Sequence, residues 1–182
     1  MWRSRLRQIE CGVLLLLAVS TLMAQAQQPK PASDPWRQLA FMLGDWTASG
    51  TKEQSEAKGG FSLKPDLDGK ILVRRNFAEY PAREAGKPPL RHEDLMIVYP
   101  SGSDSQYATI YFDNEGHVIN YVLTCDEKRS SVRLESTGPE KAPRFRLDYL
   151  LKPDSTLEIT FSIAQPGDTF KVYTTGTAHK QR

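Results

Sequence analysis

Beyond Gly44 the chain changes to a period of two and keeps that period almost to its last residue. Segments rich in Val, Ile, Thr, Tyr and Phe follow one another, and nearly every gap contains a turn signal such as Asp68-Gly69 or Pro166-Gly167. Gaps this short join antiparallel strands, since a parallel return needs a dozen or more connecting residues. The pattern predicts strands at residues 45–53, 60–67, 70–80, 94–99, 106–112, 117–125, 130–137, 144–152, 156–164 and 169–178.

Such a succession describes an up-and-down meander, and closing it into a barrel removes the two unpaired edge strands. A sandwich is the alternative, but Greek-key sandwiches usually need longer crossovers than these gaps provide. We therefore predict an all-β fold, an up-and-down antiparallel barrel of about ten strands. A barrel of this size is wide enough inside to hold a small ligand.

One short helix is expected before the strands, over residues 33–44. Ser33 or Asp34 can cap its start, and Gly44 suits its end. Its apolar face, at helical spacing, comprises Trp36, Leu39, Ala40 and Leu43. A helix this short is marginal alone, so it must dock on another apolar surface.

The first 26 residues are typical of a secretory signal peptide. Arg3, Arg5 and Arg7 precede an apolar run at residues 12–22, and Ala24-Gln25-Ala26 supplies a small-x-small cleavage site. The run is too short to span a bilayer as a helix, although retention as an N-terminal anchor is the alternative. We expect an exported protein, periplasmic or secreted, with a signal peptide at 1–26, a Pro-rich tether at 27–32 and one barrel domain at 33–182.

Charge and cysteine use narrow the choice of partners. The signal holds three of the 24 basic and one of the 22 acidic residues, so its removal leaves 21 of each. A net charge near zero offers no footprint for nucleic acid, whose affinity comes from neutralised phosphates. We expect no nucleic-acid partner and no transmembrane span after cleavage. Cys125 then stands alone, and we interpret it as a small buried hydrophobe, with a reactive or interchain thiol as the alternative.

The junction between the expected helix and the first strand carries a resemblance to known proteins. Residues 39–50 run from the apolar helix into Gly44-Asp45-Trp46, so a Gly-x-Trp motif opens the strand. This opening resembles that of calycin-like barrels, which include lipocalins, nitrobindin-like haem proteins and exported bacterial families of unknown function, and the layout is most similar to the last of these. The resemblance implies that the helix plugs one barrel end and that Trp46 packs at its base, with Gly44 and Trp46 as the structural motif.

The same resemblance implies one candidate cofactor, haem. Nitrobindin-like barrels bind haem through a histidine on a late strand, and His179 lies on the last expected strand. Haem at His179 is therefore the alternative to our expectation of no cofactor. Many calycins also carry an arginine on that strand that stacks on the tryptophan, whereas Lys180 stands there in this chain.

The candidate ligand-binding residues come from the strand alternation. Arg74 and Arg75 interrupt an apolar strand, and because neighbours point to opposite faces, one of them should face inward. We predict that Arg75 does, on the face of Val73 and Phe77, where it would anchor an acidic head group; pairing with Glu79, Glu93 or Asp94 is the alternative. The full predicted ligand set comprises Arg75, Phe77, Tyr99, Tyr111, Tyr121 and Tyr149.

No sequence motif indicates an enzyme or a metal site. The chain has no Gly-x-Ser-x-Gly elbow, no phosphate-binding glycine loop and no His-x-x-x-His or Cys-x-x-Cys spacing. We therefore expect no catalytic and no metal-ligating residues. The leading hypothesis is an exported protein that binds a small apolar or amphipathic molecule inside its barrel. The alternatives are a haem-binding protein and a structural or interaction barrel whose interior is filled by side chains.

Overall fold

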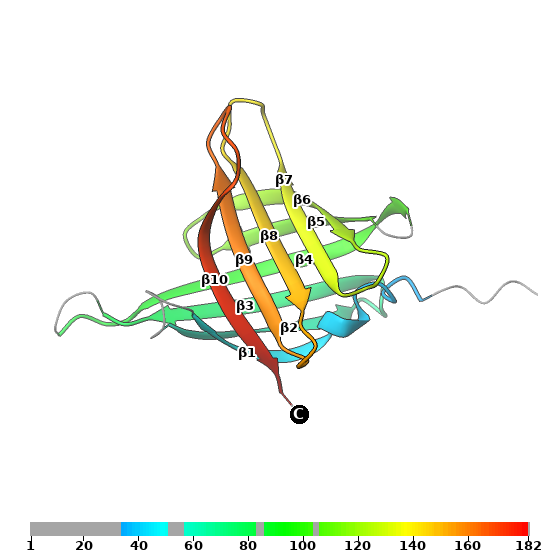
Figure 1. The fold of residues 1–182 in the computed structure, drawn as a ribbon, viewed down its shortest axis with the longest axis horizontal. Coiled ribbons are helices and arrows are strands. Elements are labelled where there is room, and N and C mark those ends of the chain that lie inside the picture. The colour runs from blue at the N-terminus through cyan, green and yellow to red at the C-terminus, as the bar shows by residue number, and fades with distance from the viewer. Residues whose placement is uncertain (1–33, 51–56, 83–85, 104–105, 182) are drawn as a thin grey trace, which may run out of the picture. The chain divides into compact units, whose positions relative to one another are not determined.

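The computed structural model describes residues 34–50, 57–82, 86–103 and 106–181, and these residues form a closed antiparallel barrel (Figure 1). Each strand pairs with its neighbours in sequence, and β1 pairs with β10 to close the barrel. The prediction of an all-β, up-and-down barrel of ten strands is confirmed. The strands are β1 Gly44–Gly50, β2 Lys58–Asp66, β3 Ile71–Tyr80, β4 Leu90–Ser103, β5 Gln106–Asp113, β6 Val118–Cys125, β7 Ser131–Thr137, β8 Arg144–Leu151, β9 Leu157–Ala164 and β10 Lys171–Lys180.

Most strand bounds lie within a few residues of the prediction, and β4 differs most. It begins at Leu90 because the pairing of β3 with β4 continues to the partners Tyr80 and Leu90. The prolines at positions 88 and 89 therefore end the loop without preventing the strand that follows them.

The predicted helix over residues 33–44 is wrong, since the described residues of this stretch form turns and one 3-10 helix, Ala40–Met42. Backbone N–H groups here donate to carbonyl oxygens three residues earlier, as Leu39 does to Trp36 and Met42 to Leu39. Three residues per turn place Trp36, Leu39 and Met42 on one side, and all three side chains are buried. Burial of these three residues thus selects the tighter turn, and Ala40, expected on the buried face, is exposed.

The segment 34–43 covers one end of the barrel. The Trp36 ring stacks on Tyr107 with centroids 5.6 Å apart, and its Nε1 donates to the Gly69 carbonyl over 2.8 Å. The Tyr107 hydroxyl donates to the Pro35 carbonyl over 2.8 Å. Inward-facing residues in the same core cluster as Trp36, Leu39 and Met42 are buried, and we call this part of the barrel the closed end; they include Leu72, Val98, Leu123, Val132 and Leu157.

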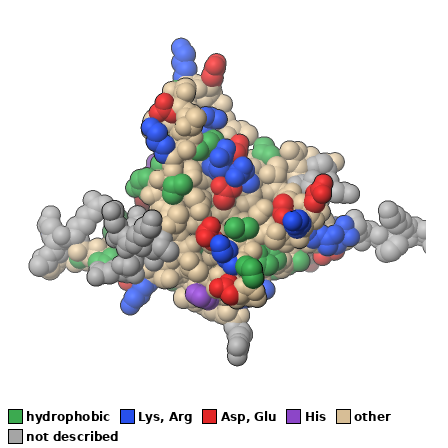
Figure 2. Space-filling view, viewed as in Figure 1, with side chains coloured by type: hydrophobic (Ala, Val, Ile, Leu, Met, Phe, Trp, Pro, Cys, Tyr) green, Lys and Arg blue, Asp and Glu red, His purple; other side chains and the backbone are tan. Residues whose placement is uncertain are grey.

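The predicted signal peptide, residues 1–26, and tether, residues 27–32, lie outside the described residues. Over the part of the chain that the structure describes, no helix has the length and apolar character needed to cross a membrane. Figure 2 shows basic and acidic side chains interspersed over one face of the molecule, and ion pairs such as Arg133 with Asp148 and Arg146 with Glu135 join neighbouring strands β7 and β8.

Cys125 ends β6, where its thiol is partly buried against the core. Burial, assisted by the nearby charge of Asp126, raises the pKa of the thiol to about 12. At this pKa little thiolate is present at neutral pH, and the thiolate is the reactive form of cysteine.

We therefore expect slow alkylation of Cys125 in the folded protein. At pH 8, iodoacetamide should react with it at least about a hundredfold more slowly than in urea, and the native rate should rise about tenfold per pH unit. Peptide mass spectrometry at Cys125 measures both rates. Equal rates in the folded and unfolded protein would show that the thiol is not protected.

Candidate functional site

Polar side chains gather on the inner face of β3 and β4. Arg74 Nη1 donates to Asp94 Oδ1 over 2.6 Å, and Asn76 Nδ2 donates to Asp94 Oδ2 over 2.7 Å. Asn76 and Asp94 are direct partners in the β3–β4 register, which brings their side chains to the same inner face. The side chains of Arg74 and Asp94 are only 7% and 5% exposed, so this is an ion pair inside the barrel.

The inward-facing arginine is therefore Arg74, and the prediction that Arg75 faces inward is wrong. Arg75 is exposed, as is Phe77 on the same face. The prediction failed because it assigned the more apolar face of β3 to the interior. The inner face instead carries Leu72, Arg74, Asn76 and Ala78, and the charge of Arg74 is compensated there by Asp94, one of the partners considered above.

The electrostatics of the pair favour both charges. Burial opposes ionisation of Asp94, but the charge of Arg74 and hydrogen bonds from His92 and Asn76 outweigh it, so the pKa of this carboxyl lies below its ordinary value. The Arg74 guanidinium carbon also lies 5.2 Å from the Phe61 ring centroid and 5.9 Å from that of Tyr149. Two aromatic rings and a carboxylate thus surround this cation.

Two buried polar atoms at this place have no hydrogen-bond partner among the described residues: Arg74 Nε and the Tyr149 hydroxyl. Phe61 packs edge-on against Tyr149 at a centroid distance of 5.8 Å, and Trp46 stacks on Phe61 at 5.9 Å. Together these residues cross the middle of the barrel, and we call Trp46, Phe61, Arg74 and Tyr149 the floor.

Beyond the floor, away from the closed end, the inward-facing side chains are only partly buried. They pack against the core and yet retain solvent exposure, and we call this region the open half; its residues include Ala48, Tyr111, Ile119, Phe145, Leu147 and Ile159. Leu147 lies in the middle of β8, and its partner Leu134 is buried. Solvent therefore reaches inward-facing residues well inside the rim.

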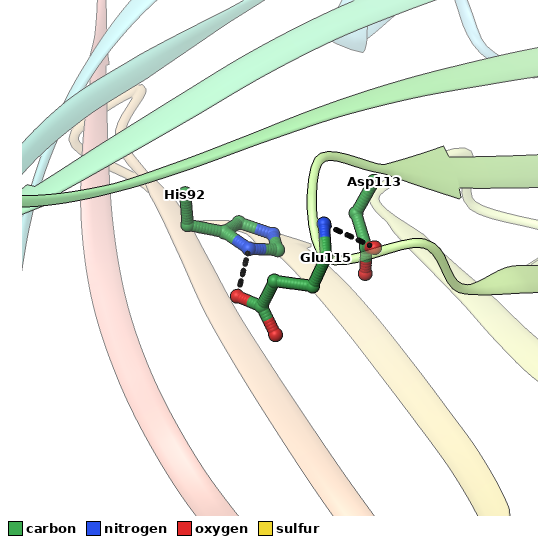
Figure 3. Close-up of side chains that lie close together, drawn as sticks. All are labelled: His92, Asp113 and Glu115. Carbon is green, nitrogen blue, oxygen red and sulfur yellow. Dashed lines mark hydrogen bonds and ion pairs between the residues drawn. The ribbon is translucent and has the colours of Figure 1, made fainter.

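A second polar cluster lies at the rim of the open half, where β4 meets the β5–β6 turn (Figure 3). His92 Nδ1 lies 3.0 Å from Glu115 Oε1, and His92 Nε2 lies 3.5 Å from Asp94 Oδ2 and 3.2 Å from the Tyr111 hydroxyl. A hydrogen bond with Asp94, which outweighs the cost of burial, and further contacts with Glu115 raise the pKa of His92 to about 9. At neutral pH this raised pKa favours the protonated ring.

Asp113, the last residue of β5, anchors the other side of this cluster. Its Oδ1 accepts backbone N–H groups from Glu115 and His117, and its Oδ2 lies 2.8 Å from His117 Nδ1. The Tyr111 hydroxyl donates to the same Oδ2 over 3.2 Å. These bonds hold the Asp113 side chain, which is only 4% exposed, and they outweigh the cost of burial, so its pKa lies below the ordinary value.

The predicted ligand residues divide between the two faces of the barrel. Tyr111, Tyr121 and Tyr149 face inward, and the rings of Tyr111 and Tyr121 meet edge-on at 6.2 Å. Arg75, Phe77 and Tyr99 do not join them, because all three are exposed on the outer face.

Arg75 and Phe77 instead line a groove of about 550 Å³ on the outer surface of β1 to β5, together with Leu95 and Phe112. Arg75 and Leu95 are register partners, as are Leu95 and Phe112, so they form one row across three strands. The Arg91 guanidinium carbon lies 4.7 Å from the Phe77 ring centroid. These four side chains face outward, and the lining of the groove also includes Trp46 and Phe61 of the floor and Asn76 and Asp94.

The Gly-x-Trp motif opens β1. Gly44 adopts φ +111°, and Trp46 is buried with its Nε1 donating to the Met42 carbonyl over 2.9 Å. The Lys180 ammonium lies 5.6 Å from the Trp46 ring centroid. Lys180 of β10 therefore makes a cation–ring contact with the tryptophan of the motif.

His179 does not point into the barrel. It is exposed and pairs in register with Thr47, whereas its neighbour Ala178 is fully buried on the inner face. His179 therefore cannot supply an axial ligand to a haem inside the barrel.

Sequence reasoning considered Asp94 as an arginine partner, but it missed Asn76 and His92 on the same inner wall and Asp113 at the rim. One signal was available: His92 and Asp94 alternate with Glu93 on a strand, which places two polar side chains on one face. The chain matches no protein-family model and no curated protein.

Proposed function

We propose that this protein is exported by its N-terminal segment and that its calycin-like barrel binds a small amphipathic molecule in the open half. The observation that carries the proposal is the partial exposure of inward-facing side chains such as Leu147 and Ile159. In a barrel filled by its own side chains, positions in the middle of a strand would be buried like their partners Leu134 and Tyr149.

The two walls of the open half differ in chemistry. Strands β8 and β9 contribute Phe145, Leu147 and Ile159, whereas β3 and β4 contribute Asn76 and His92. In the closed order of ten strands, β3 and β4 stand five strands away from β8 and β9, so the two walls face each other. An amphipathic molecule would place its hydrocarbon part on the first wall and its polar group on the second.

The same arrangement bears on the two alternative functions, a filled structural barrel and a haem protein. The interior is filled at the closed end and at the floor, and the open half is the part that remains for a ligand. Haem held through His179 is not supported, because that side chain lies outside the barrel.

The test uses two leucines of β8 that face opposite sides. Leu147→Trp should fill the open half, whereas Leu150→Trp adds the same ring to the outer face, where Leu150 is 38% exposed. We expect Leu147→Trp to weaken binding of the fluorescent amphipathic probe 1-anilinonaphthalene-8-sulfonate at least tenfold, and Leu150→Trp to leave it unchanged. Fluorescence titration measures the affinities, and circular dichroism verifies the folds.

Further variants keep the test decisive. If Leu147→Trp does not fold, Ile119→Trp adds the same ring to the open half from β6. Loss of binding in Phe77→Ala together with normal binding in Leu147→Trp would place the probe in the outer groove and contradict the proposal. Native mass spectrometry of the purified protein without added ligand should show a bound molecule of a few hundred daltons.

A further inference from the structure

The rim cluster of the open half brings one imidazole and two carboxylates together. The potential ligand atoms of His92, Asp113 and Glu115 all lie within 4.8 Å of one another (Figure 3). These residues come from β4, the end of β5 and the β5–β6 turn, so the barrel fold itself assembles them. We propose that His92, Asp113 and Glu115 bind a divalent cation of the Zn²⁺ type.

The donor set selects the kind of cation. Imidazole nitrogen suits zinc, copper, nickel and iron, whereas calcium and magnesium take oxygen ligands. Zinc binds nitrogen and carboxylate oxygen at about 2.0–2.2 Å, so tetrahedral ligands stand roughly 3.3 Å apart. His92 Nδ1 and Glu115 Oε1 are 3.0 Å apart, and the whole set needs shifts of only about 1 Å to converge.

A second observation, independent of the cluster, concerns the far side of the His92 ring. Metal-binding histidines almost always direct their other ring nitrogen to a carboxylate, a carbonyl or water, which fixes the ring. His92 Nε2 lies 3.5 Å from Asp94 Oδ2, and Asp94 is itself held by Arg74 and Asn76. The buried pair inside the barrel thus orients the imidazole with Nδ1 toward Glu115.

The two carboxylates have complementary roles. Asp113 is fixed by two backbone N–H groups on its Oδ1, while its Oδ2 faces His117 and Tyr111. Glu115 is 55% exposed in the turn and can move toward a cation without disturbing a strand. His117 Nδ1 lies 2.8 Å from Asp113 Oδ2 and helps to hold this carboxylate from outside the three-residue set.

The experiment is a titration of the metal-free purified protein with Zn²⁺ alone, and isothermal titration calorimetry measures the affinity and the number of bound ions. We expect one strongly bound equivalent and an affinity at least about a hundredfold lower in His92→Gln, which keeps a hydrogen-bonding side chain of similar size. The matched control is His179→Gln, which removes an exposed histidine on β10 and should not change the affinity. Titration with Co²⁺ should give the absorption spectrum of a tetrahedral complex.

Several results would overturn the proposal. They are the absence of strong Zn²⁺ binding to the wild-type protein, equal affinities in the wild-type and His92→Gln proteins, and Ca²⁺ binding as strong as Zn²⁺ binding. If His92→Gln does not fold, Glu115→Gln tests the same site from an exposed turn. The titration contains no organic probe, so its outcome is independent of ligand binding in the open half.

Discussion

Arg74→Met should lower the free energy of unfolding by about 3–5 kcal/mol, since it leaves the Asp94 carboxylate buried without its counter-charge. Asp94 would keep the hydrogen bond from Asn76 and the contact with His92, whose Nε2 lies 3.5 Å from its Oδ2, but it would lose the nearer guanidinium at 2.6 Å. The loss should appear as a lower midpoint in urea unfolding followed by circular dichroism. Methionine fits the space with little strain, so the effect reports the charge rather than a cavity.

The neighbouring arginine provides the matched control. Arg75→Met changes the same residue type one position away, on the outer face, and should alter stability by no more than about 0.5 kcal/mol. In the double variant Arg74→Met/Asp94→Asn, removal of the orphaned charge should restore about 1–3 kcal/mol relative to Arg74→Met. Equal destabilisation by the two arginine variants would mean that the buried ion pair does not hold β3 to β4.

Trp36→Ala is the second large effect, and we expect a loss of about 3–5 kcal/mol. The substitution removes a buried indole, its stacking on Tyr107 and its hydrogen bond to Gly69, all at the closed end. Thermal and urea unfolding both measure the change. The expected loss of unfolding free energy is as large as for a core residue, although Trp36 precedes the first strand.

Two other substitutions define the origin of this effect. Trp36→Phe keeps a ring against Tyr107 and loses the hydrogen bond to Gly69, so it should cost about 1–2 kcal/mol. Tyr173→Ala removes an aromatic side chain that is 68% exposed and should cost less than about 1 kcal/mol. A Trp36→Ala protein as stable as the wild type would show that residues 34–43 do not cap the barrel.

The barrel was predictable because its information is local. Strict alternation, as in Leu157, Ile159 and Phe161, marks each strand, and short turns leave antiparallel pairing as the only choice. Residues 34–43 were mistaken for a helix because apolar residues spaced by three and by four overlap over such a short stretch. The burial of Met42 and the exposure of Ala40 distinguish the 3-10 geometry from the helical one, and they are set by docking on the barrel rather than by local spacing.

The site was less predictable, because it depends on which face of a strand is the inner one. On β3 the apolar content of Val73 and Phe77 favoured the wrong face, and only the partner Asp94 on β4 makes an inward Arg74 favourable. The rim cluster adds a further requirement, since His92 and Asp113 come together through the register of β4 with β5. A single sequence specifies neither of these pairings before the strands are aligned.

Closure of the barrel has a consequence for the folding rate. Nine of the ten described strand pairings join neighbours in sequence and form by local hairpin closure. The tenth joins β1 to β10, which is the last strand in the chain. The hydrogen bond from Gln181 Nε2 to Thr47 Oγ1, across 134 positions, illustrates the sequence separation of this contact. The entropy of closing so long a loop is lost before the contact is gained, so this seam should form late and limit the rate. Until it forms, β1 and β10 both present unpaired backbone groups, and a nascent barrel is exposed to edge-to-edge association with other chains.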